Sequence, residues 1–527
     1  MKVRIASCPS CGGPVEFHVS SSLVTICEFC QCIVARTDKS FADHGKVSDL
    51  VLTDSPLSRG VTGKYRGKKF EIIGCVQYQH PAGGVWGEWY LLFTHGRWGW
   101  LAEAHGKYFL TFEKKTSRKL VFPPFDSLEP GARGFQWGSK GYFTVTEVGV
   151  AQTKAAEGEI PWAFRAGMPH RFVDLHGDDR AFATLDYSQP EPKVFVGHEL
   201  TLKELDLSDT GWSGGATGGF GQEGENRVTA ITVNCPHCAG ALQLYAPDET
   251  QRVSCPNCAS LLDCDNGKLE YLRTLHTKRK HPLIPLGSIG TLNGVEYTVI
   301  GFMERVARYQ GLDFPWTEYL LKSKQSGYRW LVHNNRHWSF VEPVSAHDVV
   351  SSHHSAKYKN EDFRIYDRGT ATVRFVLGEF YWKVQVGDEV HTTDYIAPPR
   401  MLSCERSGAP TSTLSSQELN VSLGTYLTPE QIEEAFGIKT GTRPWGVGVI
   451  QPALRAGDIM KLWVIFLITL VLSYTLFSWT LKQGVDTSFF IMSLVLVSVI
   501  PVAFSCYRHQ FEVSRWKDSD FSPYHDE

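Results

Sequence analysis

A four-cysteine pattern occurs twice in this 527-residue sequence, and the segments that follow each copy also match one another. The first copy begins at Cys8 and the second at Cys235, 227 positions later. Further landmarks that keep their order are Gly67 and Gly294, Gly74 and Gly301, Trp86-Gly87-Glu88-Trp89 and Trp316-Thr317-Glu318-Tyr319, Trp100-Leu101 and Trp330-Leu331, 158–162 and 378–382, Asp174 and Asp394, and 204–208 and 418–422. Collinear landmarks at a nearly constant offset predict a tandem duplication of one structural unit.

The duplication predicts how the chain is divided. A glycine-rich stretch between the two copies has the composition of a flexible linker. We expect the following order of segments: zinc ribbon 1 at 1–40, β-rich unit 1 at 55–208, the linker at 209–227, zinc ribbon 2 at 228–272, β-rich unit 2 at 283–437, a second linker at 438–460, a transmembrane hairpin at 461–507 and a cytosolic tail at 508–527.

The cysteine spacing within each copy predicts a zinc ribbon, with one Cys-x-x-Cys turn at the tip of each of two hairpins. Zinc prefers four tetrahedral ligands, and thiolates suit it. Four protein ligands leave no open position, so we expect two structural Zn²⁺ ions and no catalytic metal. The expected ligands are Cys8, Cys11, Cys27, Cys30, Cys235, Cys238, Cys255 and Cys258. Redox or disulfide chemistry is the alternative, but a redox Cys-x-x-Cys is expected once, beside a βαβ pattern.

The rest of each unit has the character of antiparallel β-structure. Aromatic residues make up 12% of the chain, and apolar side chains alternate along 371–377. The glycine of Gly378-Glu379, repeated at Gly158-Glu159, predicts a type II′ hairpin turn. Thr428-Pro429-Glu430-Gln431 predicts a capped short helix in unit two, which unit one lacks. The expected fold class is mainly β: two units of a zinc ribbon plus an antiparallel barrel or sandwich, followed by a two-helix transmembrane hairpin.

Two uncharged apolar stretches, Leu462–Trp479 and Ser488–Cys506, predict the transmembrane hairpin. Each is close to the ~20 residues that span a bilayer as a helix. Two buried core helices are the alternative, but neither stretch has the polar stripe of a helix that also faces water. Basic residues flank the pair on its outer sides at Arg455, Lys461, Arg508, Arg515 and Lys517. The positive-inside rule therefore predicts that both termini are cytoplasmic, and the hairpin could also form oligomers.

Polar and aromatic residues that persist through the duplication are the candidates for ligand or partner binding. They are Trp86, Glu88, Glu159, Trp162, Trp316, Glu318, Glu379 and Trp382, with Asp174 and Asp394 as further matched carboxylates. One interpretation places them in a cleft that binds a cation or a peptide. The other gives the tryptophans to the core and the glutamates to turns or cross-strand pairs. No phosphate-binding loop or hydrolase motif occurs, so we predict no catalytic residues and no turnover.

Charge does not favour a nucleic-acid partner. The chain has 53 Lys and Arg against 56 Asp and Glu. By the same count ribbon 1 is net +1 and ribbon 2 is net −3. A phosphate-binding surface needs clustered basic residues, which neither ribbon has.

Both units resemble the bacterial domain-of-unknown-function family 4178. The segments that carry the resemblance are Gly67 through Gly74, 86–92 and 96–101 in unit one, and Gly294 through Gly301, 316–321 and 327–331 in unit two. The family name implies no activity. The resemblance implies one component of a multi-component system at the bacterial inner membrane.

Three functional hypotheses follow. The leading one is a membrane-anchored scaffold or adaptor that binds protein or peptide partners at the cytosolic face. The second is a ligand-sensing or enzyme-like β-domain that uses the duplicated Glu and Trp positions. The third is a zinc-ribbon protein that tethers nucleic acid.

Overall fold

The computed structural model describes residues 4–524, except for a set of short segments and one longer one. These segments are 18–23, 31, 37–40, 47–49, 51–54, 81–83, 95, 105–106, 116–121, 138–140, 163, 209–230, 247–249, 266–267, 275–279, 310, 408–415, 442, 454–455 and 482–486. The predicted glycine-rich linker at 209–227 and most of the predicted loop between the apolar helices lie outside the described residues.

Unit one is an antiparallel barrel in which eight strands close into a ring. Each strand pairs with the next strand around the ring, and the last pairs with the first. In ring order the strands are β7 (Lys68–Gln79), β8 (Val85–Phe93), β9 (Trp98–Ala104), β10 (Lys107–Glu113), β15 (Lys193–Leu200), β14 (Ala181–Asp186), β13 (Pro169–His176) and β12 (Tyr142–Ile160). We call this ring barrel one.

Unit two repeats the same ring with the same strand order. In ring order the strands are β22 (Val295–Tyr309), β23 (Leu312–Ser323), β24 (Gly327–Asn334), β25 (His337–Val344), β31 (Gln417–Leu427), β30 (Arg400–Ser407), β29 (Glu389–Ala397) and β28 (Glu361–Phe380). We call it barrel two. The expected fold class is therefore confirmed, with closed barrels as the form that each β-rich unit takes.

A short strand group precedes each barrel and carries its four cysteines. The groups are β1 (Arg4–Ser7), β2 (Pro14–Phe17), β3 (Val24–Ile26), β4 (Cys32–Arg36) and β5 (Phe41–Lys46), and then β16 (Ile231–Asn234), β17 (Ala241–Leu244), β18 (Arg252–Ser254), β19 (Ser260–Asp265) and β20 (Lys268–Thr274). β3 pairs with the end of β12, and β18 pairs with the end of β28. Each ribbon is thus an extension of the longest strand of its barrel.

Smaller elements cover or edge the barrels. They are β6 (Thr62–Tyr65), η1 (Phe125–Ser127), β11 (Arg133–Gln136), α1 (Leu202–Leu205), β21 (Ile289–Leu292), η2 (Ala346–Asp348), β26 (Val349–Ser351), β27 (Ser355–Tyr358) and α2 (Pro429–Phe436). In barrel one the covered outer surface is apolar: Leu57, Val61 and Leu205 belong to one buried cluster with Leu91 and Leu101 of the barrel strands. The hydrophobic core of unit one therefore includes a layer between the barrel and its cover.

Side chains from opposite strands meet inside each barrel. The ring of Phe109 in β10 lies 6.0 Å from that of His176 in β13. In barrel two, Arg305 of β22 reaches Glu405 of β30 with 2.8 Å between Nη1 and Oε1. Because successive side chains of a strand alternate between faces, these contacts identify the inner face of every strand in the ring. We call the two interiors lumen one and lumen two.

The structure corrects the predicted turns at Gly158-Glu159 and Gly378-Glu379. β12 and β28 run through both glycines without turning. Gly158 and Gly378 have φ of +66° and +84°, and a Cβ at either would meet a backbone oxygen of the neighbouring strand at 2.2 and 2.4 Å. Glycine is required there because the strand passes close to its neighbour as it leaves the barrel for the ribbon.

The structure also corrects the end of the repeat. The capped helix α2 has a counterpart in α1, whose cap residue Thr201 donates its backbone N–H to Glu204 Oε2 at 2.8 Å. Thr201 follows β15 and Thr428 follows β31, so the offset there is again 227. The prediction that unit one lacks the helix was wrong, as was the pairing of 204–208 with 418–422. α1 is short and has no proline in its first turn, so comparison of the two sequences did not match it with α2.

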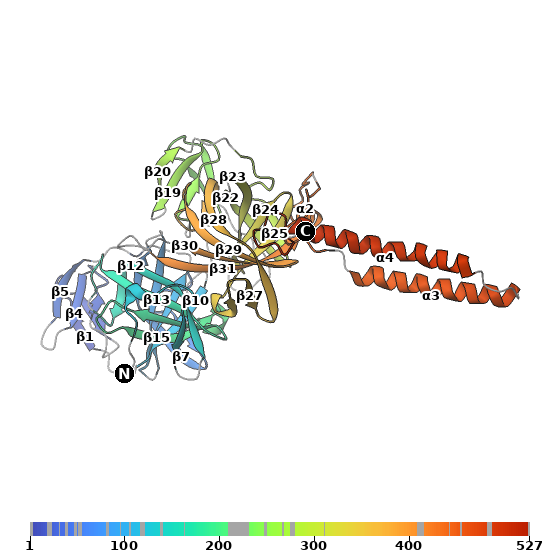
Figure 1. Cartoon of the computed structure of the whole chain (residues 1–527). Coiled ribbons are helices and arrows are strands. Elements are labelled where there is room, and N and C mark those ends of the chain that lie inside the picture. Colours follow the sequence, from blue (N-terminus) through green and yellow to red (C-terminus); the bar gives the residue numbers. More distant parts are fainter. Residues whose placement is uncertain are drawn as a thin grey trace.

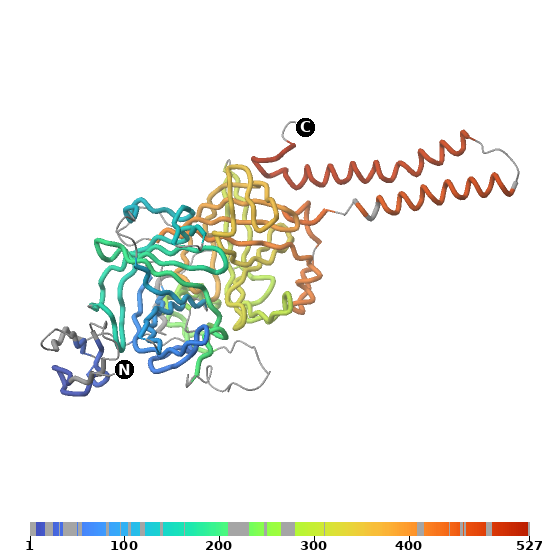
Figure 2. Tube along the Cα trace, turned by 90° about the horizontal axis from the view of Figure 1, so that it is seen from below, coloured from blue at the N-terminus to red at the C-terminus, as the bar shows by residue number. Residues whose placement is uncertain are grey.

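The two units form one continuous body. β12 of barrel one pairs with β31 of barrel two. Arg406 of unit two donates to the carbonyl of Pro130 at 2.7 Å, and His347 of unit two lies within 3.0 Å of Thr144 and of Asp178. Figures 1 and 2 show the two barrels side by side, with unit two nearer to the helical hairpin.

Helices α3 (Ala456–Leu481) and α4 (Thr487–Arg515) project from the body as an antiparallel pair (Figure 1). The stretches Met460–Thr480 and Thr487–Arg515 are long and apolar enough to cross a membrane, and their most apolar windows are not buried in the structure. This exposure argues against two buried core helices. At 1.5 Å per residue, α3 would extend for roughly 39 Å, and a bilayer core is about 30 Å thick.

The end of α4 is fastened to unit two. Arg515, only 1% exposed, donates to the carbonyls of Val449 and Gln451, both at 2.7 Å. The Tyr366 hydroxyl of barrel two donates to the Arg515 carbonyl at 3.1 Å, and its ring packs on Trp516. We call this set of contacts the C-terminal clamp. Of the predicted cytosolic tail at 508–527, the residues up to Arg515 belong to α4, and Trp516 and Ser519 beyond it contact Tyr366 of barrel two.

Candidate metal centres and barrel lumens

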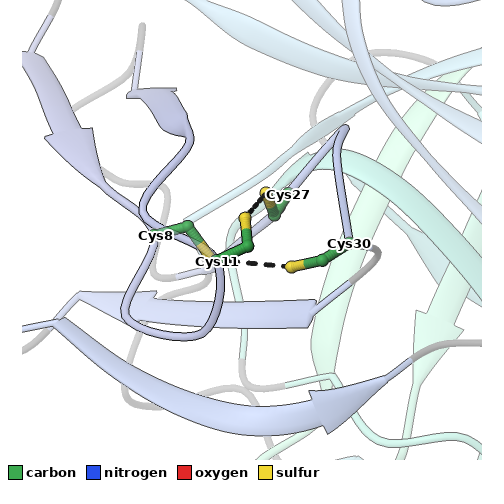
Figure 3. A group of neighbouring side chains, drawn as sticks. All are labelled: Cys8, Cys11, Cys27 and Cys30. Atoms are coloured by element: carbon green, nitrogen blue, oxygen red, sulfur yellow. Dashed lines mark hydrogen bonds between the residues drawn. The ribbon is translucent and has the colours of Figure 1, made fainter.

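The four cysteines of each ribbon converge on one point. Figure 3 shows those of ribbon 1. In ribbon 1 the sulfurs of Cys8 and Cys30 lie 3.7 Å apart, and those of Cys11 and Cys27 lie 3.6 Å apart. The corresponding pairs in ribbon 2 are both separated by 3.9 Å. Four sulfurs at 2.3 Å from a tetrahedral metal would be about 3.8 Å from one another. Each group could therefore hold one metal ion.

The local backbone explains why these sulfurs converge. The Cys8 N–H donates to the Gly13 carbonyl at 2.7 Å, and the Cys235 N–H donates to Gly240 at 2.9 Å. The residue after the second cysteine of the turn is left-handed in both copies, with φ of +76° at Gly12 and +58° at Ala239. None of the eight cysteines forms a disulfide, and such a closed set of four suits a structural metal.

Two of the duplicated glutamates lie where ribbon and barrel join. The Glu379 carboxylate accepts hydrogen bonds from the N–H groups of Tyr245 and Ala246, at 2.6 and 3.0 Å, and from the Thr250 hydroxyl at 2.8 Å. Burial raises the pKa of Glu379, although these donors oppose the shift. Glu159 is 2% exposed at the matching position. Glu379 therefore anchors ribbon 2 to barrel two.

The neighbouring tryptophans pack beside these joints. The ring of Trp162 lies 5.0 Å from that of Trp100, and that of Trp382 lies 5.7 Å from that of Trp330. Each pair joins the segment after a long strand to β9 or β24. For these residues the structure supports the packing interpretation of the duplicated positions.

The other duplicated glutamate lies in the lumen of each barrel. In lumen two, Glu318 accepts from Trp316 Nε1 at 2.6 Å and from Arg305 Nη1 at 3.2 Å. The same guanidinium nitrogen reaches Glu405 at 2.8 Å, and the guanidinium lies 5.7 Å from the Trp316 ring. A buried cation is thus held between two carboxylates and against an indole. Burial raises the pKa of Glu318, while Arg305 opposes that shift.

Lumen one repeats the carboxylates without the arginine. Glu88 accepts from Trp86 Nε1 at 3.3 Å, and Tyr78 stands at the position of Arg305, with its ring stacked 5.1 Å from Trp86. Asp186 stands at the position of Glu405. Burial raises the pKa of Glu88 to about 7, the Trp86 hydrogen bond opposes this, and the charge of Asp186 adds to it.

Each lumen contains one further carboxylate at a matched position, Asp174 in barrel one and Asp394 in barrel two. Thr184 donates to Asp174 at 2.7 Å in barrel one, and Ser403 donates to Asp394 at 2.6 Å in barrel two. Burial raises the pKa of Asp394 to about 7 and raises that of Asp174 well above its usual range. A connected cavity of about 2850 Å³ is lined by lumen side chains of both barrels.

Sequence reasoning missed Arg305, Glu405, Tyr78 and Asp186. Arg305 and Tyr78 occupy matched positions in the aligned repeats, so their difference was visible as a change from an aromatic residue to a cation. Nothing in the sequence indicated that Glu405, 100 positions away along the chain, would meet that cation.

These features define a protein of two lumen-bearing β-barrels, each carrying a four-cysteine centre, with two helices able to cross a membrane. The sequence profile of the family described as "Domain of unknown function (DUF4178)" matches residues 58–202 and 285–429, which together are more than half of the chain. The chain belongs to this family and contains two copies of its domain.

Other comparisons add little. No curated protein matches this sequence. One solved structure that is similar in part is a mutant of the vaccine antigen transferrin-binding protein B from Haemophilus parasuis Hp5. It is 6% identical, covers 81% of this chain and 86% of its own, and has a TM-score of 0.11. At that score the likeness carries no argument about this chain.

Proposed function

We propose that this chain is a membrane-anchored binding protein that takes a small ligand into its barrel lumens. One observation carries the proposal: the duplicated Trp-x-Glu pair of β8 and β23 faces the lumen in both barrels, where carboxylates and aromatic rings line a cavity. Eight-stranded barrels of other proteins are just wide enough to hold one small ligand. The second hypothesis from the sequence, a ligand-sensing β-domain, is therefore preferred to the scaffold.

The ribbons would hold structural Zn²⁺, because four thiolates at these separations satisfy a tetrahedral ion completely. With no position left for water, such a centre supplies stability and no Lewis-acid step. Binding without turnover is the proposed mode of action.

The membrane is proposed to be the bacterial inner membrane, with the whole body on its cytoplasmic side. The clamp and the start of α3 lie at the same end of the hairpin (Figure 2), so one face of the membrane would carry both barrels. Lys461 and Arg508 flank the spans on that side, as the positive-inside rule requires of a cytoplasmic face. Arg515 contributes less to the positive charge beside the membrane than the sequence suggested, because its side chain is buried in the clamp.

A protein partner at the cytosolic face is the second candidate function. It is favoured by Leu312 and Phe314, which are 65% and 42% exposed where β22 turns into β23. Two exposed apolar side chains at one hairpin tip could seat a partner within a multi-component membrane system.

A lumen-filling variant tests the leading proposal. Ala102 of β9 lies opposite Glu88, and Val332 of β24 lies opposite Glu318. Full-length protein in detergent is dialysed to equilibrium against a cell metabolite extract, and the retained compounds are identified by mass spectrometry. We expect a compound enriched by the native chain to be lost in Ala102→Trp, in Val332→Trp, or in both. Enrichment of no compound by the folded native chain would contradict the proposal. A protein that the native chain and both variants capture equally in a pull-down from detergent extract would favour the second candidate function.

A further inference from the structure

The two barrels offer an internal comparison, because the same strand positions hold different side chains. Arg305 pairs with Trp316 across β22 and β23, and Tyr78 pairs with Trp86 across β7 and β8. Two residues further along the same strands, Glu318 lies opposite Met303 and Glu88 lies opposite Val76. The two carboxylates that hold Arg305, Glu318 and Glu405, therefore have acidic counterparts in lumen one, but Arg305 itself does not.

Lumen two shows what these positions can bind. Its guanidinium is held at 3.2 Å from Glu318, at 2.8 Å from Glu405 and over the face of Trp316. Charge-assisted hydrogen bonds and an aromatic face are the two interactions by which proteins recognise organic cations. In barrel two that cation is the side chain of Arg305 on β22.

Lumen one keeps the recognition groups and lacks the internal cation. Glu88 and Asp186 stand at the positions of Glu318 and Glu405, and Trp86 stands at that of Trp316. His170 lies 3.7 Å from Asp186, and burial lowers the pKa of its imidazole while the charge of Asp186 opposes that shift, so it is not a permanent cation as an arginine is. The basic groups at the rims, His80 and Lys107, are paired with other glutamates. Lys193 lies opposite Asp186 in the register of β14 and β15 but is exposed at the end of its strand. Among the described residues, therefore, no cation is buried between Glu88 and Asp186 as Arg305 is buried in lumen two.

We propose that lumen one binds a small organic cation, of the guanidinium or primary ammonium class, between Glu88 and Asp186 and against Trp86. This rests on the proposed lumen-binding function and names the ligand class for one barrel. Tyr78 fills part of the space that Arg305 fills in lumen two, so the cation enters beside Tyr78 from the open part of the lumen. Lumen two carries its own cation and binds none while Arg305 is in place.

Calorimetric titration of the full chain in detergent tests the proposal, with ethylguanidinium and butylammonium as probes and ethylurea as a neutral control at equal ionic strength. We expect one cation site per chain and no heat from ethylurea. Glu88→Gln and Asp186→Asn should each weaken cation binding at least tenfold. Glu430→Gln, at an exposed position of α2 outside both lumens, is the control and should leave the affinity unchanged. Equal binding by the native chain and by Glu88→Gln would overturn the proposal.

Two exchanges between the barrels test the comparison itself. Tyr78→Arg should provide lumen one with its own guanidinium and abolish probe binding, with an unchanged or raised melting temperature. Arg305→Leu should free the carboxylates of lumen two, lower the melting temperature, and raise the stoichiometry from one site to two. If Arg305→Leu fails to fold, Tyr78→Arg still decides, because retained probe binding in that variant would contradict the assigned site.

The outcomes separate this inference from the function on which it rests. If a neutral or anionic compound is enriched from the extract and lost in Ala102→Trp, while neither cation binds, the ligand class is wrong and the lumen function stands. If the folded native chain enriches nothing and binds no cation, both fail.

Discussion

At the scale of single residues, one substitution between the two copies changes the character of a whole lumen. In barrel two, Arg305 compensates Glu318 and Glu405 in a buried position. In barrel one, the uncharged Tyr78 cannot compensate Glu88, and burial raises the pKa of Glu88 to about 7. An uncompensated buried carboxylate costs stability, which proteins commonly accept at sites that bind something.

The raised pKa of Glu88 gives a pH-dependent stability with a defined sign. The folded protein holds this proton up to about pH 7, whereas the unfolded chain releases it near 4.5. Unfolding therefore releases a proton between these values, and this contribution makes the protein less stable as pH rises through that window. Glu88→Gln should remove it, so at pH 8 the variant without ligand should be more stable than the native chain by on the order of 1–3 kcal/mol. Thermal unfolding from pH 4.5 to 8 measures the difference.

Glu318→Gln is the matched control for that prediction and should act in the opposite direction. It leaves Arg305 with one carboxylate in place of two, so it should destabilise at pH 8. A lower melting temperature for Glu88→Gln at pH 8 would show that Glu88 is a structural group.

At the scale of elements, each ribbon has a small core and four cysteines that could hold a metal ion. The ribbons have small buried clusters, in which the cysteines themselves are a large part. Segments with so little apolar burial commonly need a further source of stability, which a metal ion bound by the four cysteines would supply.

We predict two zinc ions per chain and separate effects of losing each. Zinc binding contributes roughly 10–16 kcal/mol in comparable small modules. Cys235→Ser should unfold ribbon 2 and Cys8→Ser should unfold ribbon 1, with little effect on the distant copy because separate sites act nearly additively. Elemental analysis gives the stoichiometry, and hydrogen exchange locates the loss. One equivalent of zinc or less in the native chain would contradict this.

The hairpin should place its connecting loop on the far side of the membrane from the body. The short 480–487 segment joins two apolar stretches, and the start of α3 and the end of α4 lie at the end of the hairpin nearer to the body. A cysteine introduced by Gly484→Cys should react with an impermeant thiol reagent in intact cells, while Cys11, which is exposed on ribbon 1, should react only after lysis. Reversed labelling of these two positions would show the opposite orientation.

At the scale of the whole molecule, the clamp makes body and hairpin one mechanical unit. Arg515 satisfies three carbonyls of the 448–451 segment and also pairs with Glu512. Ser519 donates to the Tyr366 carbonyl on barrel two. Tyr366, Val449 and Arg515 of the clamp also line the cavity that includes lumen two.

Arg515→Leu should release the clamp without unfolding the barrels. The carbonyls it leaves behind lose their donors, at a cost of about 1–3 kcal/mol for each buried group. We expect faster hydrogen exchange in 445–451 and 508–520, with unchanged exchange in barrel one as the internal control. Arg508→Leu, on the exposed part of α4, is the matched variant and should change neither. Protection that persists in Arg515→Leu would show that Trp516 packing holds α4 unaided.

The sequence by itself determined the features that depend on local spacing or composition. Cys-x-x-Cys pairs bring two sulfurs together within one turn, apolar stretches of bilayer length are recognisable anywhere, and collinear landmarks reveal a duplication. The β class followed from the alternation along strands such as 371–377. The wrong prediction of a turn at Gly158-Glu159 also has a local cause. A glycine with positive φ occurs both in turns and where two strands pass close together, and the sequence does not distinguish the two.

The tertiary structure alone decided which face of each strand lies inside. Alternation defines two faces of each strand, but only closure of the ring decides which of them points inward. In barrel one the inward face carries Glu88, Asp174 and Asp186. The other face carries leucines such as Leu91, which lie under an outer cover. Only closure brings Arg305 and Glu405 together, because strands far apart in the sequence meet across a lumen. The same holds for Arg515 and Gln451, whose contact requires that α4 return to the body.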